Sequence, residues 1–175
     1  MVGHSIAIRP GASRSAAKIE IERRFLVRDE GWRSSVIESL SLRDGILSAA
    51  GGSKVRVRTD GQGAWITVKG PRVGIVRPEF EYPIPLADAE EMLATLCVGA
   101  VIEKTRHRVP RHGHVWDVDV YGGALSGIVH AEVELAREDE PLSLPSWVGE
   151  EITGDPAYSK RALFDRVGRA AQPGV

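Results

Sequence analysis

Hydrophobic and polar residues alternate with a period of two over much of the chain between residues 19 and 135. Because successive side chains of a β-strand point to opposite faces, this alternation predicts half-buried strands. A hairpin turn is expected at Asp60-Gly61-Gln62-Gly63, between two of these strands. The predicted strands cover residues 19–27, 54–58, 65–69, 77–82, 102–108, 115–120 and 131–135.

Helical periodicity is confined to short segments. Residues 86–96 follow Pro85 and carry apolar side chains along one side, which predicts a helix. A second helix is predicted over residues 160–167, ending near Gly168, and a weaker one over residues 31–39. Many strands in succession with a few short helices predict an α+β domain built on an antiparallel barrel or sandwich.

The chain of 175 residues is long enough for one domain with a substantial core. Residues 1–17 contain arginine but no acid and are expected to be a disordered extension, residues 18–169 a single domain, and residues 170–175 a tail. The sequence contains no run of 18 apolar residues, so no membrane-spanning helix is predicted. Cys97 is the only cysteine, which excludes an internal disulfide and suits a reducing, cytoplasmic location.

The whole-chain charge is nearly balanced, with 23 Lys+Arg against 24 Asp+Glu and a formal net charge of −1. This balance argues against a partner held by bulk electrostatic attraction, such as nucleic acid or an acidic membrane surface. The totals do not show where the charges lie along the predicted strands.

Like charges repeat at every second strand position, so they share one face. One such segment alone is typical of a solvent-exposed strand face. Several together are harder to explain, because like charges about 7 Å apart repel unless a group of opposite charge lies between them. The repeated pairs are Glu20 and Glu22, Arg56 and Arg58, Glu79 and Glu81, Lys104 with Arg106 and Arg108, Asp117 and Asp119, and Glu132 and Glu134.

The two charge types suit two parts of one ligand. Paired carboxylates supply the hard oxygen ligands that Mg²⁺ or Mn²⁺ prefers. Arg and Lys donate hydrogen bonds to phosphate oxygens. Both sets on one surface therefore favour a site for a metal-chelated polyphosphate. If about eight strands close into a barrel with this face inward, the charges line a tunnel.

An ordered set of motifs resembles the CYTH domain family, the triphosphate tunnel metalloenzymes. The segment Glu20-Ile21-Glu22-Arg23-Arg24 is similar to the amino-terminal Glu-x-Glu-x-Lys signature of that family. The resemblance covers residues 19–163 and implies a closed eight-stranded antiparallel β-barrel around a charged tunnel, with a few short flanking helices. It continues through residues 55–58, 67–70, 77–81, 103–106, 116–119, 131–135, 147, 151–153 and 155.

The short chain is most similar to the small bacterial inorganic tripolyphosphatase-like branch. The resemblance implies hydrolysis of inorganic tripolyphosphate or an organic triphosphate with Mg²⁺ or Mn²⁺, and family barrels can pair as homodimers. The implied metal ligands are Glu20, Glu22, Asp119, Glu132 and Glu134, with Asp117 a weaker candidate. The implied substrate-binding bases are Arg24, Arg56, Arg58, Lys69, Arg77, Lys104 and Arg106. Glu22 and Lys104 are implied to be catalytic, and Glu79 and Glu81 match acids that orient the bases or hold a second metal.

Three positions depart from the family pattern. Arg24 stands where Lys is usual, and Lys160 where Asn is expected. Ile46 aligns with a family Tyr that, paired with the Lys corresponding to Lys104, is thought to help prepare the attacking water. Isoleucine has no group for this task, so either metal and carboxylate activate the water alone, or the substrate or rate differs.

Other functions stay open on the sequence alone. A class IV-type adenylyl cyclase would use the same fold with an internal 3′-hydroxyl as nucleophile. A non-catalytic polyphosphate- or nucleotide-binding module is favoured by Arg24 and Ile46. Nucleic-acid binding is disfavoured, because acids balance the bases and few aromatic residues lie among them.

Overall fold

Antiparallel strands dominate the computed structural model, which describes residues 18–170. The strands are β1 (Lys18–Val27), β2 (Glu38–Ala50), β3 (Ser53–Thr59), β4 (Ala64–Lys69), β5 (Val76–Pro83), β6 (Ile102–Arg111), β7 (His114–Tyr121), β8 (Val129–Glu134) and β9 (Val148–Glu151). The helices are α1 (Leu86–Thr95) and α2 (Lys160–Ala170), with 3₁₀ turns η1 (Arg33–Ser35), η2 (Gly123–Leu125) and η3 (Pro156–Tyr158). The predicted extension over residues 1–17, the tail beyond residue 170 and the Lys160 side chain lie outside the described part.

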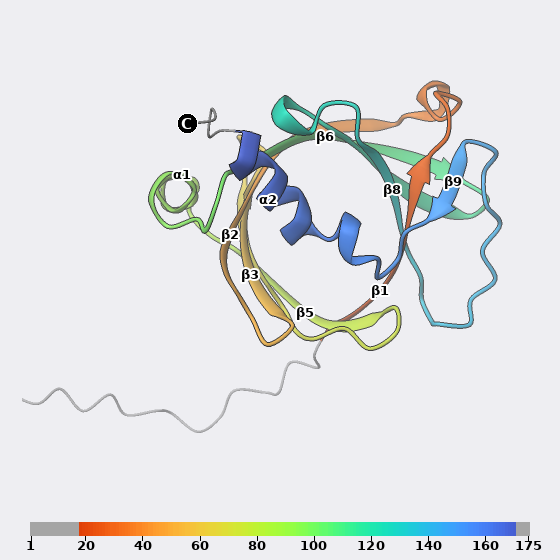
Figure 1. The fold of residues 1–175 in the computed structure, drawn as a ribbon. Coiled ribbons are helices and arrows are strands. Elements are labelled where there is room, and N and C mark those ends of the chain that lie inside the picture. Colours follow the sequence, from red (N-terminus) through yellow and green to blue (C-terminus); the bar gives the residue numbers. More distant parts are fainter. Residues whose placement is uncertain (1–17, 171–175) are drawn as a thin grey trace, which may run out of the picture.

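The strands close into a ring, which confirms the barrel that the family resemblance implied (Figure 1). The hydrogen-bonded order is β5-β4-β3-β2-β6-β7-β8-β1, and β1 also pairs with β5 to complete the barrel. All of these pairings are antiparallel, and β9 adds to β1 as an extra strand outside the ring. Closure leaves the eight ring strands without free edges. No helix within residues 18–170 has the length and apolar character needed to cross a membrane.

The main hydrophobic core lies outside the barrel wall, which inverts the usual arrangement. On β7, Trp116 and Val118 are fully buried and alternate with Asp117 and Asp119, which point inward. The outer face packs under β9 and the segment before it, where the Trp116 and Trp147 rings meet edge to face at 5.6 Å between centroids. Because the stabilising apolar contacts are outside, the inside is available for charged side chains.

Helix α2 closes one end of the barrel, and Figure 1 shows it lying across the opening. Leu163 and Phe164 of this helix are buried against Ile46, Ile102 and Tyr121, which come from three different strands. Together they form an apolar plug. Helix α1 lies on the outer surface instead, where its buried Ala89 and Leu93 pack against β3.

The helix predicted over residues 31–39 is wrong. Only the 3₁₀ turn Arg33–Ser35 forms there; the backbone is extended at Val36, and β2 begins at Glu38. Trp32 is fully buried and anchors this turn to the outer core. The alternation of Leu40 and Leu42 with serines, and tertiary pairing with β3 and β6, outweigh weak local helical signals. Strands β2 and β9 were not predicted, whereas the helices near residues 86–96 and 160–167 are confirmed.

Candidate active site

A cavity of about 750 Å³ occupies the inside of the barrel. Every strand of the ring contributes side chains to its lining, and most of them are charged. The predicted site residues therefore converge on one space, although they are spread over more than 110 positions of sequence, from Glu20 to Glu134. Lys104 and Asp119 are the exceptions: they are buried against the wall and are not among the described residues that line the cavity.

Carboxylates gather on the side formed by β1 and β8. Glu22 lies opposite Glu134 in the antiparallel register, and Glu132 lies opposite Arg24. Burial raises the pKa of Glu22, and the negative charges of Glu132 and Glu20 add to this effect against the opposing Arg24. Such mutually repelling, partly desolvated carboxylates are the donor type that fits a hard divalent cation.

The acids nevertheless contact bases as the structure stands. Within residues 18–170, no three Asp, Glu, His or Cys side chains converge closely enough to hold a metal ion. Glu20 illustrates why: its Oε1 lies 2.5 Å from Lys69 Nζ and its Oε2 lies 3.8 Å from Arg77 Nε. The donor set fits a divalent cation, and metal binding would have to replace some of these ion pairs.

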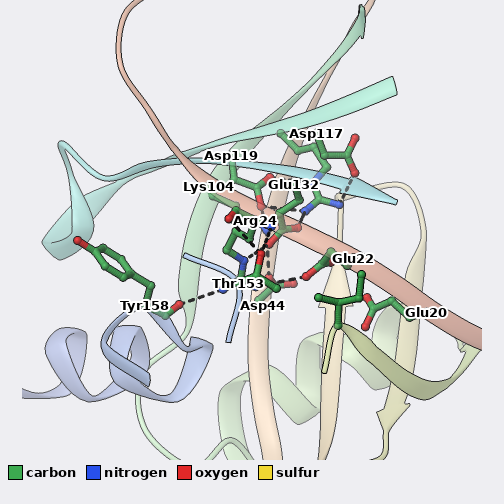
Figure 2. Close-up of polar contacts among 12 residues, drawn as sticks. Glu20, Glu22, Arg24, Asp44, Lys104, Asp117, Asp119, Glu132, Thr153 and Tyr158 are labelled. Carbon is green, nitrogen blue, oxygen red and sulfur yellow. Dashed lines mark hydrogen bonds and ion pairs between the residues drawn. The ribbon is translucent and has the colours of Figure 1, made fainter. Parts of the chain in front are cut away.

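Arg24 lies between Glu132 of the adjacent strand β8 and Tyr158 of η3 (Figure 2). Its Nε lies 2.9 Å from Glu132 Oε1, and its NH1 donates to the Tyr158 carbonyl oxygen at 2.9 Å. Burial alone would lower the pKa of this guanidinium, but Glu132 and Glu22 raise it above its ordinary value. Arg24 is therefore a permanently charged, fixed donor in the position where the signature usually has Lys.

Asp119 binds two bases at once (Figure 2). Its carboxylate contacts Lys104 Nζ and accepts from Arg106 at 2.7 and 2.8 Å. Burial alone would raise the Asp119 pKa, but Arg106 and Lys104 outweigh it and lower the value to about 2. Arg106 also donates to Glu132 and Asp117, each at 2.7 Å. The structure thus places the predicted metal ligand Asp119 among bases.

The opposite wall carries Arg56 and Arg58 of β3, and each of these arginines is held by a neighbouring polar group. Arg58 makes a two-point contact with Asp44 at 2.6 and 3.1 Å. Arg56 donates to the Thr67 hydroxyl at 3.0 Å and lies 3.5 Å from Glu81. These contacts fix guanidinium positions toward the cavity before any substrate arrives.

Sequence reasoning missed Asp44 and Thr67, which hold the arginines of β3 in place. Asp44 is only 2% exposed and lies on β2 between the inward positions Leu42 and Ile46. The alternation of residues 40–46 was the available signal, but the strand itself was not predicted. Thr67 had no signal, because a lone threonine in a strand is ordinary.

The sequence is similar to one protein family and to two inorganic triphosphatases. The model of the CYTH domain matches residues 18–162. The chain is 40% identical over 139 residues to an inorganic triphosphatase of Acetivibrio thermocellus, covering 79% of this chain and 88% of that protein. It is 35% identical over 149 residues to an inorganic triphosphatase of Nitrosomonas europaea, covering 82% and 95%.

Solved structures show the same fold. The crystal structure of the inorganic triphosphatase NE1496 superposes with a TM-score of 0.61 at 33% identity, covering 83% of this chain and 97% of that one. A putative adenylate cyclase of Bacillus halodurans superposes with a TM-score of 0.54 at 17% identity, covering 69% and 82%. At that identity the second likeness concerns the fold alone.

Proposed function

Since the chain belongs to the CYTH domain family, we propose that it is a triphosphatase that hydrolyses the terminal phosphoryl group of a triphosphate. The observation that carries this proposal is the charged cavity inside the barrel, which is lined by bases of β3, β4 and β5 and by carboxylates of β1 and β8. The sequence similarity to two inorganic triphosphatases supports inorganic tripolyphosphate as a substrate.

The bases would bind and orient the phosphate chain. Several of them already point into the cavity, so the substrate needs only to exchange carboxylate contacts for phosphate contacts. They would neutralise the equatorial oxygens of the transferred group, where charge is concentrated in the transition state. The proposed phosphate-binding residues are Arg24, Arg56, Arg58, Lys69, Arg77 and Arg106.

The carboxylates of β1 and β8 would hold a divalent cation, Mg²⁺ or Mn²⁺. Their oxygen donors and mutual repulsion fit such an ion. The chemistry that such an ion would supply there is neutralisation of phosphate charge and activation of water for attack. The proposed ligands are Glu20, Glu22, Glu132 and Glu134.

Two buried residues receive different roles from those implied by the family resemblance. Both Asp119 oxygens contact Arg106, and one also contacts Lys104, so we assign Asp119 to fixing these bases. Lys104 is 4% exposed, and its Nζ contacts Asp119 and lies 3.8 Å from Asp44. We therefore assign Lys104 a positioning role, exerted through Asp119 on Arg106.

Ile46 cannot orient the attacking water, because it belongs to the apolar plug beneath α2. It contributes no proton donor or acceptor at the end of the tunnel. The task of positioning water therefore falls to the carboxylates that line the cavity. Among them, Glu22 of β1 and Glu134 of β8 lie directly opposite each other in the antiparallel register. Glu22 is the residue whose replacement tests the mechanism most directly.

Phosphate release with Mg²⁺ or Mn²⁺ from tripolyphosphate, ATP, thiamine triphosphate and pyrophosphate tests the proposal. We expect Glu22→Gln to lower kcat/KM by at least about 100-fold, more than the loss of an outer-shell partner costs. Glu150→Gln, an exposed position on β9, is the matched control and should keep wild-type activity. Absence of phosphate release from all four compounds rules out the hydrolase, and chromatography of the ATP reaction would reveal a cyclic nucleotide product.

A further inference from the structure

Lys54 lies in the tunnel but belongs to none of the residue pairs described above. It is on β3 two residues before Arg56, so both side chains share the inward face. In the register of β3 with β4 it lies directly opposite Lys69. It lines the cavity together with Lys69, Arg56 and Arg77, and it is partly buried.

Among the residues that the structure describes, Lys54 has no acidic partner, unlike the neighbouring bases of the cavity lining. Within the described range 18–170, each other buried or partly buried base of the cavity lining has a carboxylate oxygen within 4.0 Å. For Lys54 there is no such contact, and the nearby acids Glu20 and Glu79 are engaged by Lys69 at 2.5 and 2.9 Å. Its surroundings are therefore positively charged.

The electrostatic consequence is a destabilised ammonium group. Burial lowers the pKa of Lys54, and the positive charges of Lys69, Arg77, Arg56 and Arg24 lower it further, to about 7. A protein gains nothing in its own fold from placing a lysine among four other cations. An anionic ligand would remove this cost, because it would pair with Lys54 and with the neighbouring bases together.

We propose that Lys54 binds the terminal phosphate that is not transferred, at the far end of an inorganic polyphosphate chain, and so favours inorganic triphosphate over a triphosphate that carries an organic group at that end. This deepens the proposed function and rests on it. In a nucleoside triphosphate, the phosphate at one end is esterified and carries fewer charged oxygens, and an uncharged sugar follows it. Placed beside Lys54, that end would leave the lysine without a full counter-charge.

Steady-state hydrolysis of tripolyphosphate and ATP with Mg²⁺ tests this inference on the full chain. We expect Lys54→Gln to raise the KM for tripolyphosphate by at least about tenfold and the KM for ATP by less than about threefold. Lys54→Arg keeps the charge and should stay near wild type. Arg111→Gln removes the same charge from the exposed end of β6 and should change neither KM.

An unchanged KM in Lys54→Gln, or an equal rise for both substrates, overturns the inference. If the wild-type chain releases no phosphate from either compound, the proposed function fails separately. Calorimetric titration of tripolyphosphate into the wild-type and Lys54→Gln proteins then decides the role of Lys54. Binding at least about tenfold weaker in the variant supports it, and equal binding overturns it.

Discussion

At the scale of single residues, the tunnel holds matched ion pairs, and within residues 18–170 Lys54 is the partly buried base of its lining that has no carboxylate oxygen within 4.0 Å. Arg58 with Asp44 and Lys69 with Glu20 are examples of bases already fixed by acids at 2.6 and 2.5 Å. Such pairs cost desolvation energy and are weak evidence for stability, so their value lies in pre-orienting the charges. Lys54 has no such partner in the described residues, so its protonation state should directly change the affinity for an anionic substrate.

The Lys54 pKa of about 7 predicts a pH-dependent KM. Below pH 7 the side chain is charged and binds phosphate; above pH 7 it becomes neutral, so the KM for tripolyphosphate should rise between pH 6 and pH 8. The groups that face Lys54 are the cations Arg56, Lys69, Arg77 and Arg24. Profiles of wild type and Lys54→Arg check this, because titration of the substrate itself is common to both. If the KM for tripolyphosphate changed with pH in the same way in both proteins, the prediction would be wrong.

At the scale of elements, α2 determines which end of the barrel is closed. Its Leu163 is fully buried and Phe164 is 4% exposed, and both pack on side chains from the rims of the strands. Ile46 is part of this contact. The isoleucine that replaces the family Tyr therefore packs against the helix in this chain. The side chain at position 46 thus connects α2, through packing, to the end of the tunnel that this helix closes.

Leu163→Ala should destabilise the protein by about 2–5 kcal/mol, because it removes buried methyl groups from the apolar plug and leaves a cavity. Denaturant titration measures the free energy of unfolding. Leu96→Ala, at a position that is 60% exposed, is the control and should change it by less than about 0.5 kcal/mol. An unfolding free energy equal to wild type in Leu163→Ala would show that α2 does not stabilise the barrel.

At the scale of the whole molecule, stability and function occupy opposite sides of one wall. The apolar clusters that include Trp116 and Val57 lie on the outer face, while the charges lie inside. A net charge of −1 conceals this arrangement, because acids and bases cancel within a single cavity. Neutrality therefore excludes bulk attraction of a charged partner but is compatible with a charged ligand inside.

Removal of divalent metal should abolish turnover without unfolding the protein. The reason is that the hydrophobic contacts are outside the tunnel and the carboxylates contact bases in their own right. Phosphate release in the presence of EDTA should fall to background and return on addition of Mg²⁺ or Mn²⁺. Circular dichroism should show a cooperative melt throughout. Full activity in EDTA, or loss of the melt, would contradict this separation.

The period-two pattern was enough to predict the barrel strands other than β2. It also placed Glu20 with Glu22, and Arg56 with Arg58, on the same face of their strand, because successive side chains of a strand point to opposite faces. Helical periodicity was enough to predict the helices near residues 86–96 and 160–167. It failed over residues 31–39, where pairing with neighbouring strands outweighs local preference.

Only the tertiary structure decided which charges meet. Closure between β1 and β5 places Glu20 beside Lys69 and Arg77, although about 50 residues separate them in the sequence. The register of β6 with β7 places Asp119 opposite Arg106 and in contact with Lys104. The register of β3 with β4 places Lys54 opposite Lys69, among cations. Alternation determines the face of a side chain, but its partner across the barrel depends on strand order and register, which a local pattern does not contain.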